Sequence, residues 1–157
     1  MRPVLLLIAA AAVLAIFRLP TQRDASNVPN AELETIALNF ALCSAPGYAR
    51  NCVTDGDTFR LGRRRIRVVG IDTAERNARC EAEARLARRA TLALQDWLNR
   101  GTFTMAAQQG NTIDRYGRDL RTIWRDGANG ERELLTTFMR ETAGARPYMG
   151  GARQGWC

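Results

Sequence analysis

Two aspartates stand one residue apart in the segment Asp55-Gly56-Asp57-Thr58. Calcium and other hard cations prefer oxygen ligands, and two carboxylates held on one turn can supply them. The same segment also fits an ordinary hairpin turn, because Asp-Gly is a turn-forming dipeptide in any protein. The pair is therefore a candidate cation site or a simple turn.

A second acidic group follows an arginine inside an apolar run, in the segment IRVVGIDTAE at 66–75. On such a strand the guanidinium of Arg67 needs an anion, either a structural carboxylate or the phosphate of a substrate. Asp72, Thr73 and Glu75 come where the strand gives way to a loop, which places two carboxylates and a hydroxyl at its exit. The alternative is a solvated turn that caps the following helix.

A third charged segment, DRYGR at 114–118, is typical of a hairpin tip at Tyr116-Gly117 flanked by solvated charges. Alternatively, Arg118 begins a strand and points to the same place as Arg67. Together the three segments hold what the hydrolysis of a phosphodiester requires. These are an oxygen-ligated cation, a carboxylate base and two arginines for the negative charge that builds on phosphorus.

The composition favours a globular domain with affinity for polyanions. The chain has 157 residues and a formal net charge of +7, and all 23 of its basic residues are arginine. Such a charge favours nucleic acid, anionic lipid or acidic polysaccharide as a partner. The absence of histidine excludes Ser-His-Asp and Cys-His triads, two-histidine zinc sites and a histidine general base.

The apolar patterns predict a mainly β domain with two helices. Apolar residues alternate over Glu34 to Cys43, as on a strand with one buried face, with a helix from Ala31 as the alternative. The further expected elements are a strand before a tight turn at Asp55-Gly56, a strand from there to a turn around Gly62, strands over 65–71, 102–107 and 119–124, and helices over 80–100 and 131–142. The second helix should bury Leu134, Leu135, Phe138 and Met139 and stop at Gly144. Five strands with a helix between the third and fourth are the order of an α+β OB-fold barrel.

The first residues lie outside the expected fold. Val4 to Phe17 form an unbroken apolar stretch, which has the length of a signal peptide and is short for a membrane span. An uncleaved anchor, with Arg2 inside and Arg18 outside, is the alternative. In both cases the domain is exported, to the periplasm or the extracellular space, and residues 4–17 are a candidate membrane tether. The expected organisation is a signal peptide or anchor over 1–20, a linker over 21–33 and one folded domain over 34–157.

Four cysteines, an even number, indicate two disulfides in an oxidising compartment. Of the possible pairings we favour Cys43–Cys52, which closes a short loop with glycine and proline, and Cys80–Cys157, which ties the chain end to the start of a helix. A tetrahedral zinc site is the rival interpretation, although the spacing contains no CxxC pair.

The charged segments also occur in the order of a known family. From Val53 to the C-terminus the chain resembles the staphylococcal-nuclease-like (thermonuclease) domain, in the stretches VTDGDTF, IRVVGIDTAE, CEAEARLARRAT, DRYGR and GARPY. The resemblance covers roughly two-thirds of the chain, and several motifs in the correct order are hard to obtain by chance. It implies a calcium-dependent nuclease that cuts DNA and RNA on the 5′-oxygen side and leaves 3′-phosphates.

Carried over where the motifs match, the resemblance implies a calcium site. Its ligands are Asp57, Asp72 and the backbone carbonyl of Thr73, with Asp55 close by in a supporting role.

The resemblance also implies catalytic and substrate-binding residues. Glu75 is the general base for the attacking water, and Arg67 and Arg118 bind the phosphate and stabilise the five-coordinate transition state. Tyr116 lines the nucleotide site. Its neighbour Arg115 and a base-stacking Tyr148 complete the expected substrate-binding set.

Two features depart from the family pattern. Its usual proline between threonine and glutamate is Ala74 here, and the ending GGARQGWC replaces a long C-terminal helix. The alternative function is a catalytically inactive nuclease-like module that binds nucleic acid or protein, and a third is a basic envelope protein whose charge serves the membrane surface. The presence of all three family carboxylates and both arginines favours an active nuclease, which we expect to act as a monomer.

Overall fold

The computed structural model describes residues 33–45 and 50–157. The apolar stretch 4–17 and most of the predicted linker lie outside the described residues. Within the described ranges, no helix combines the length and the apolar character needed to cross a membrane.

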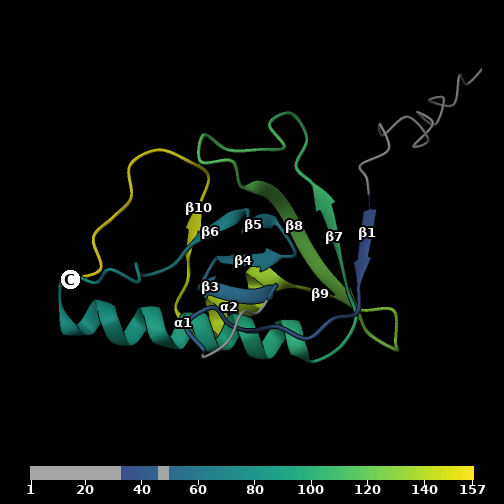
Figure 1. Ribbon diagram of the computed structural model, residues 1–157, viewed down its shortest axis with the longest axis horizontal. Coiled ribbons are helices and arrows are strands. Elements are labelled where there is room, and N and C mark those ends of the chain that lie inside the picture. Colours follow the sequence, from purple (N-terminus) through teal and green to yellow (C-terminus); the bar gives the residue numbers. More distant parts are fainter. Residues whose placement is uncertain (1–32, 46–49) are drawn as a thin grey trace, which may run out of the picture.

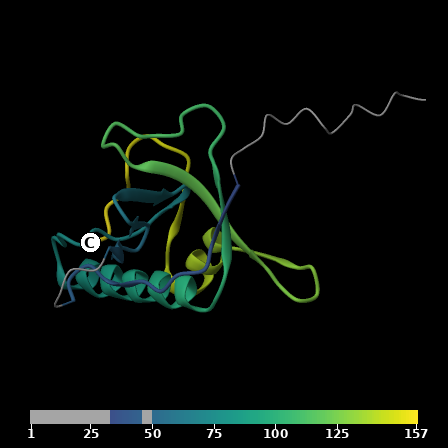
Figure 2. The same cartoon turned by 45° about the vertical axis from the view of Figure 1, so that its right-hand side comes forward.

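Most strands belong to one curled sheet (Figure 1). Its order is β1-β7-β8-β5-β4-β3-β2, with β9 also paired to β8, while β6 and β10 form a separate antiparallel pair. The strands are β1 (Leu33–Ile36), β2 (Ala41–Leu42), β3 (Asn51–Asp55), β4 (Thr58–Leu61), β5 (Arg64–Val68), β6 (Gly70–Asp72), β7 (Phe103–Ala107), β8 (Asp119–Asp126), β9 (Arg132–Leu134) and β10 (Arg146–Tyr148). The predicted α+β class, mainly strands, is confirmed, and the sheet curls as a half-barrel with more strands than the five predicted (Figures 1 and 2).

Two helices cover one side of this sheet. α1 (Glu81–Asn99) packs against β3 and against α2 (Leu135–Ala143). The apolar stripe of α1 is buried with the aromatic side chains of the sheet, and Trp97 and Phe103 have ring centroids 5.8 Å apart. The predicted bounds of α1 are confirmed to within one residue at each end. Gly144 ends α2 at φ 72°, a left-handed conformation that glycine adopts without strain.

The strand predicted over Glu34 to Cys43 is wrong in its middle, where the chain leaves the sheet between β1 and β2. Phe40 turns into the core and is 2% exposed. Its N–H donates to the side chain of Asn99 at 2.8 Å, and its carbonyl accepts from Gln95 and Asn99 at 3.0 Å. Side chains of α1 therefore take the hydrogen bonds that a neighbouring strand would otherwise make.

Two other predicted elements are divided differently. The strand over 65–71 breaks after Val68, because Gly70 has φ 87° and turns the chain from β5 into β6, which pairs with β10. The helix over 131–142 begins only at Leu135, because residues 132–134 pair with β8 as β9. Leu134 is consequently 38% exposed, not buried as predicted.

Both favoured disulfides are present. Cys43 and Cys52 bridge β3 to the turn after β2, with their Cα atoms 4.9 Å apart. Cys80 and Cys157 join the start of α1 to the last residue, with their Cα atoms 6.0 Å apart. The described residues contain no free cysteine, so a zinc site built from four thiolates is excluded.

Candidate functional site

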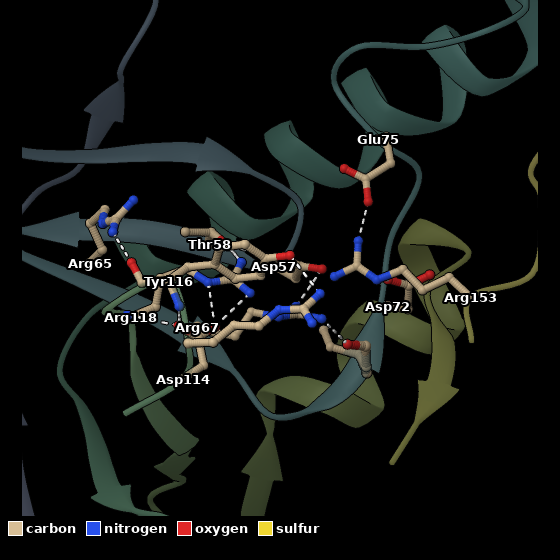
Figure 3. Close-up of polar contacts among 12 residues, drawn as sticks. Asp57, Thr58, Arg65, Arg67, Asp72, Glu75, Asp114, Tyr116, Arg118 and Arg153 are labelled. Atoms are coloured by element: carbon tan, nitrogen blue, oxygen red, sulfur yellow. Dashed lines mark hydrogen bonds and ion pairs between the residues drawn. The ribbon is translucent and has the colours of Figure 1, made fainter. Parts of the chain in front are cut away.

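Two of the three charged segments line one cleft of about 1070 Å³, and the Asp55 to Thr58 segment contacts it through Arg67 and Arg118 (Figure 3). Six of the predicted catalytic and substrate-binding residues line it: Arg67, Glu75, Arg115, Tyr116, Arg118 and Tyr148. The predicted metal ligands Asp57, Asp72 and Thr73 are buried, each 4–5% exposed, and the two aspartates pair with arginines of the cleft.

The Asp55-Gly56-Asp57 turn is fixed by its own side chain and by close packing. Asp55 Oδ1 accepts a hydrogen bond from the Asp57 N–H at 3.1 Å, which closes the turn. A Cβ atom on Gly56 would lie 2.5 Å from Cβ of Ala90 in α1 and 2.8 Å from Oγ1 of Thr73. Only glycine therefore fits where the turn packs on the helix, and this contact sets the position of Asp57.

Arg67 has the anion that its buried position requires. Its Nη1 forms an ion pair with Oδ2 of Asp57, and its Nη2 donates to the carbonyl of Ile71 at 2.8 Å. No acceptor lies in line with the N–H bonds of Nη1, so this nitrogen keeps a donor unused. The anion of Arg67 is thus a structural carboxylate, that of Asp57, as one of the two interpretations of the sequence expected. The Arg67 side chain also lines the cleft.

Arg118 is held by an acid of its own segment. Asp114 Oδ2 accepts from Arg118 Nε at 2.8 Å, and Asp114 Oδ1 accepts from the backbone N–H groups of Tyr116 and Arg118 at 2.9 Å. These hydrogen bonds outweigh the effect of burial and hold the pKa of Asp114 below its usual range. Arg118 Nη1 in turn donates to Thr58 Oγ1 at 3.2 Å, and Thr58 donates to Asp57 at 2.9 Å.

A continuous chain of polar contacts therefore runs from Arg118 through Thr58 and Asp57 to Arg67 (Figure 3). The structure brings the two predicted catalytic arginines to opposite ends of this chain. Arg118 pairs with Asp114 and approaches Asp57, the acid of Arg67, only through the hydroxyl of Thr58.

The two tyrosines of the cleft differ in how their side chains are held. Tyr116 is 56% exposed and its hydroxyl accepts from Arg115 at 2.7 Å. Tyr148, on β10, donates its hydroxyl to the carbonyl of Gly151 at 2.9 Å. Tyr116 thus presents a ring at the rim of the cleft, whereas Tyr148 is tied to the C-terminal segment.

The electrostatics of the three aspartates favour a cation beside them. Burial and the charge of Asp57 raise the pKa of Asp55 to about 7. Burial also raises the pKa of Asp72, the guanidinium of Arg153 opposes this, and the charge of Asp57 adds to it. Oδ1 of Asp72 is buried and accepts no hydrogen bond. A buried carboxylate oxygen costs free energy unless a cation meets it, and in this structure Arg153 Nε lies 3.2 Å from it.

The candidate calcium site offers few carboxylate ligands. Within the described residues, only one group of three Cys, Asp or Glu side chains has its ligand atoms within 4.8 Å of one another, namely Cys80, Glu83 and Cys157. The two cysteines of this group are joined in a disulfide. Asp55, Asp57 and Asp72 are therefore not gathered as a preformed cage. Two carboxylates, a backbone carbonyl and water oxygens remain an all-oxygen set that suits calcium.

Comparison with known proteins adds no relative. No model of a protein family matches the chain, and no curated protein matches it significantly. The assignment to the staphylococcal-nuclease-like family thus stays a proposal carried by the motifs and by the geometry of the cleft.

Sequence reasoning missed Arg153 and Trp156. Arg153 Nε lies 3.2 Å from Oδ1 of Asp72, and its Nη1 pairs with Oε1 of Glu75 (Figure 3). Trp156 is 9% exposed and packs in a small apolar cluster with Ala74. One signal was available, since a Cys80–Cys157 disulfide forces the last residues to pass close to Glu75, five positions before Cys80.

Proposed function

We propose that the chain is a calcium-dependent nuclease of the staphylococcal-nuclease type, which hydrolyses phosphodiester bonds in DNA or RNA and leaves 3′-phosphates. The observation that carries the proposal is the polar chain from Arg118 through Thr58 and Asp57 to Arg67, with Glu75 on the same cleft. Three separate segments of the sequence supply it, and Arg118 reaches the acid that pairs with Arg67 through the hydroxyl of Thr58.

In this proposal each group has one task. Asp57, Asp72 and the carbonyl of Thr73 would hold calcium, which supplies positive charge to the phosphate oxygens when bound. Arg67 and Arg118 donate to the non-bridging oxygens and stabilise the charge that builds on phosphorus. Glu75 accepts a proton from water as the water oxygen bonds to phosphorus and the bond from phosphorus to O5′ breaks; solvent returns a proton to the leaving O5′.

The same proposal covers the finer points of architecture and location. The curled sheet would be the OB-fold barrel of this family, and the domain would be exported and act as a monomer. Two disulfides are consistent with an oxidising compartment.

The test uses purified protein with its disulfides intact. Single-stranded DNA, duplex DNA and RNA are incubated with it in calcium and then in excess EDTA. We expect cleavage in calcium and none in EDTA. We also expect a loss on the order of a thousandfold in Arg118→Ala and in Glu75→Gln, because each change removes a group that acts in the transition state.

The matched control is Arg85→Ala, which removes one arginine from the exposed surface of α1, where it pairs with Glu81. This variant should cleave at the wild-type rate. A folded wild-type protein that retains DNA without cleaving it in calcium would contradict the nuclease proposal. That result would favour the inactive binding module.

A further inference from the structure

The last nine residues, 149–157, form a strap that closes over the proposed site. The disulfide to Cys80 fixes its end beside the start of α1. The guanidinium of Arg146 lies 3.7 Å from the centroid of the Trp156 ring and donates to a strap carbonyl, that of Gly155, at 3.0 Å. The strap is therefore held to the domain at several points, and Figure 1 shows it as a loop from the end of β10 to the start of α1.

The strap carries one arginine onto two acids of the site. Arg153 pairs with Asp72 through Nε and with Glu75 through Nη1, and both acids come from the segment after β5 (Figure 3). The Asp72 side chain is 6% exposed and that of Arg153 is 37% exposed. The Asp72 side chain is thus buried in this contact, whereas the Arg153 side chain reaches solvent.

The guanidinium meets a buried carboxylate oxygen. Oδ1 of Asp72 is buried without an aligned hydrogen bond, and Arg153 Nε lies 3.2 Å from it. Arg153 supplies positive charge to this oxygen and, at the same time, to Glu75. A divalent cation held by Asp72 would bring a second positive charge to the same carboxylate, and two cations at one small site repel each other.

We infer that Arg153 sets the cation affinity of the proposed metal site, because it holds Asp72 and Glu75 in the metal-free protein and must be displaced when a divalent cation binds. The inference rests on the proposed function, since it takes Asp72 as a metal ligand. The strap makes the competition intramolecular, so that the guanidinium is present at a high effective concentration. Loss of an ion pair with this exposure changes an equilibrium by about three- to tenfold.

The experiment measures calcium binding by isothermal titration calorimetry, on the full chain without substrate. Arg153→Ala should lower the calcium Kd by about three- to tenfold, because the competing cation is gone. Arg153→Lys, which keeps the charge, should stay closer to the wild type. Arg85→Ala is the control for the loss of one positive charge elsewhere and should leave the Kd unchanged.

A second variant tests the strap itself. The double change Cys80→Ser with Cys157→Ser frees the end of the strap and keeps the other disulfide. It should lower the calcium Kd toward that of Arg153→Ala. Adding Arg153→Ala to this double variant should then give a smaller decrease than it gives in the wild type, because both changes weaken the same competitor.

The outcomes separate this inference from the function on which it rests. If the wild type and Arg153→Ala bind calcium equally, or if the variant binds more weakly, the role of Arg153 is overturned and the calcium site stands. If neither protein binds calcium, the metal site and the inference fall together. If the double-cysteine variant does not fold, Arg153→Ala alone decides, because it leaves both disulfides in place.

Discussion

Replacing Arg67 by alanine should destabilise the fold as well as abolish cleavage. The side chain is 5% exposed and its partner Asp57 is 8% exposed, so the ion pair is almost fully removed from water. The substitution leaves a buried carboxylate without its cation and the carbonyl of Ile71 without its donor. Removing one member of a buried pair costs ~3–5 kcal/mol, against a total stability of ~5–15 kcal/mol for an ordinary domain.

Arg118 provides a comparison for the stability cost of removing Arg67. Its side chain is 17% exposed, as is that of Asp114, with which it pairs near the mouth of the cleft. Solvent screens such a pair more than the buried one, so Arg118→Ala should cost only ~1 kcal/mol. Both variants should lose cleavage by a similar factor. The two arginines therefore differ in their structural roles and share a chemical one.

Urea unfolding followed by tryptophan fluorescence measures this difference, in EDTA and again in calcium. In EDTA, Arg67→Ala should lose at least ~3 kcal/mol relative to the wild type, with little change in the slope against urea. In calcium part of that loss should return, because a cation at Asp57 compensates the unpaired charge. A loss below ~1 kcal/mol in EDTA would refute the view that Arg67 and Asp57 are a buried structural pair.

Three further changes test other parts of the arrangement. The hydrogen bond from Arg64 holds the pKa of Glu34 below its usual value, so its contribution is present at neutral pH and lost as the pH falls through that lowered pKa. Glu34→Gln should therefore cost ~0.5–1 kcal/mol near neutral pH, after allowance for screening, and progressively less as the pH falls through the lowered pKa of Glu34. A cost independent of pH in urea titrations would argue against the pair. Gly56→Ala should lower stability by ~1–3 kcal/mol in thermal unfolding, because the new Cβ would lie 2.5 Å from the Cβ of Ala90. An unchanged stability would mean that the turn can move away from α1. Asp114→Ala should reduce kcat by about tenfold and lower stability by ~1 kcal/mol, since it frees the arginine of its loop and removes the same ion pair as Arg118→Ala. An unchanged kcat would show that the loop needs no such anchor.

Local signals were enough to predict most elements of the fold. The stripe on α1, the turns at Asp55-Gly56 and Gly62, and the stop at Gly144 follow from periodicity and from residues with special backbone freedom. Both disulfides were also predicted, because an even number of cysteines and one short loop, that of Cys43–Cys52, leave Cys80 and Cys157 as the other pair. The stripe, the turns and the helix stop depend on neighbours in sequence, which is why one sequence suffices for them.

The wrong predictions depend on partners far away in the chain. The break in the strand at Phe40 depends on hydrogen bonds from Gln95 and Asn99, more than fifty residues away. The replacement of a helical turn by β9 depends on the free edge of β8, which pairs with residues 132–134. Periodicity within a window contains no information about either contact, and tertiary pairing overrode the local preference in both places.

The residues of the site could be predicted from the sequence, but the ion pairs between its arginines and acids could not. Each acid or arginine, seen alone in the sequence, fits a turn or a solvated charge, and the structure instead joins Arg67 to Asp57, Arg118 to Asp114, and Arg153 to Asp72. Burying an unpaired charge costs several kcal/mol, so a cleft with this many acids requires nearly as many arginines if the protein is to fold without a cation. The family pattern places two of these arginines where a phosphate would meet them. The third comes from the strap, whose end is fixed by a disulfide across 77 residues; that disulfide was the one signal in the sequence that could have placed it near Glu75.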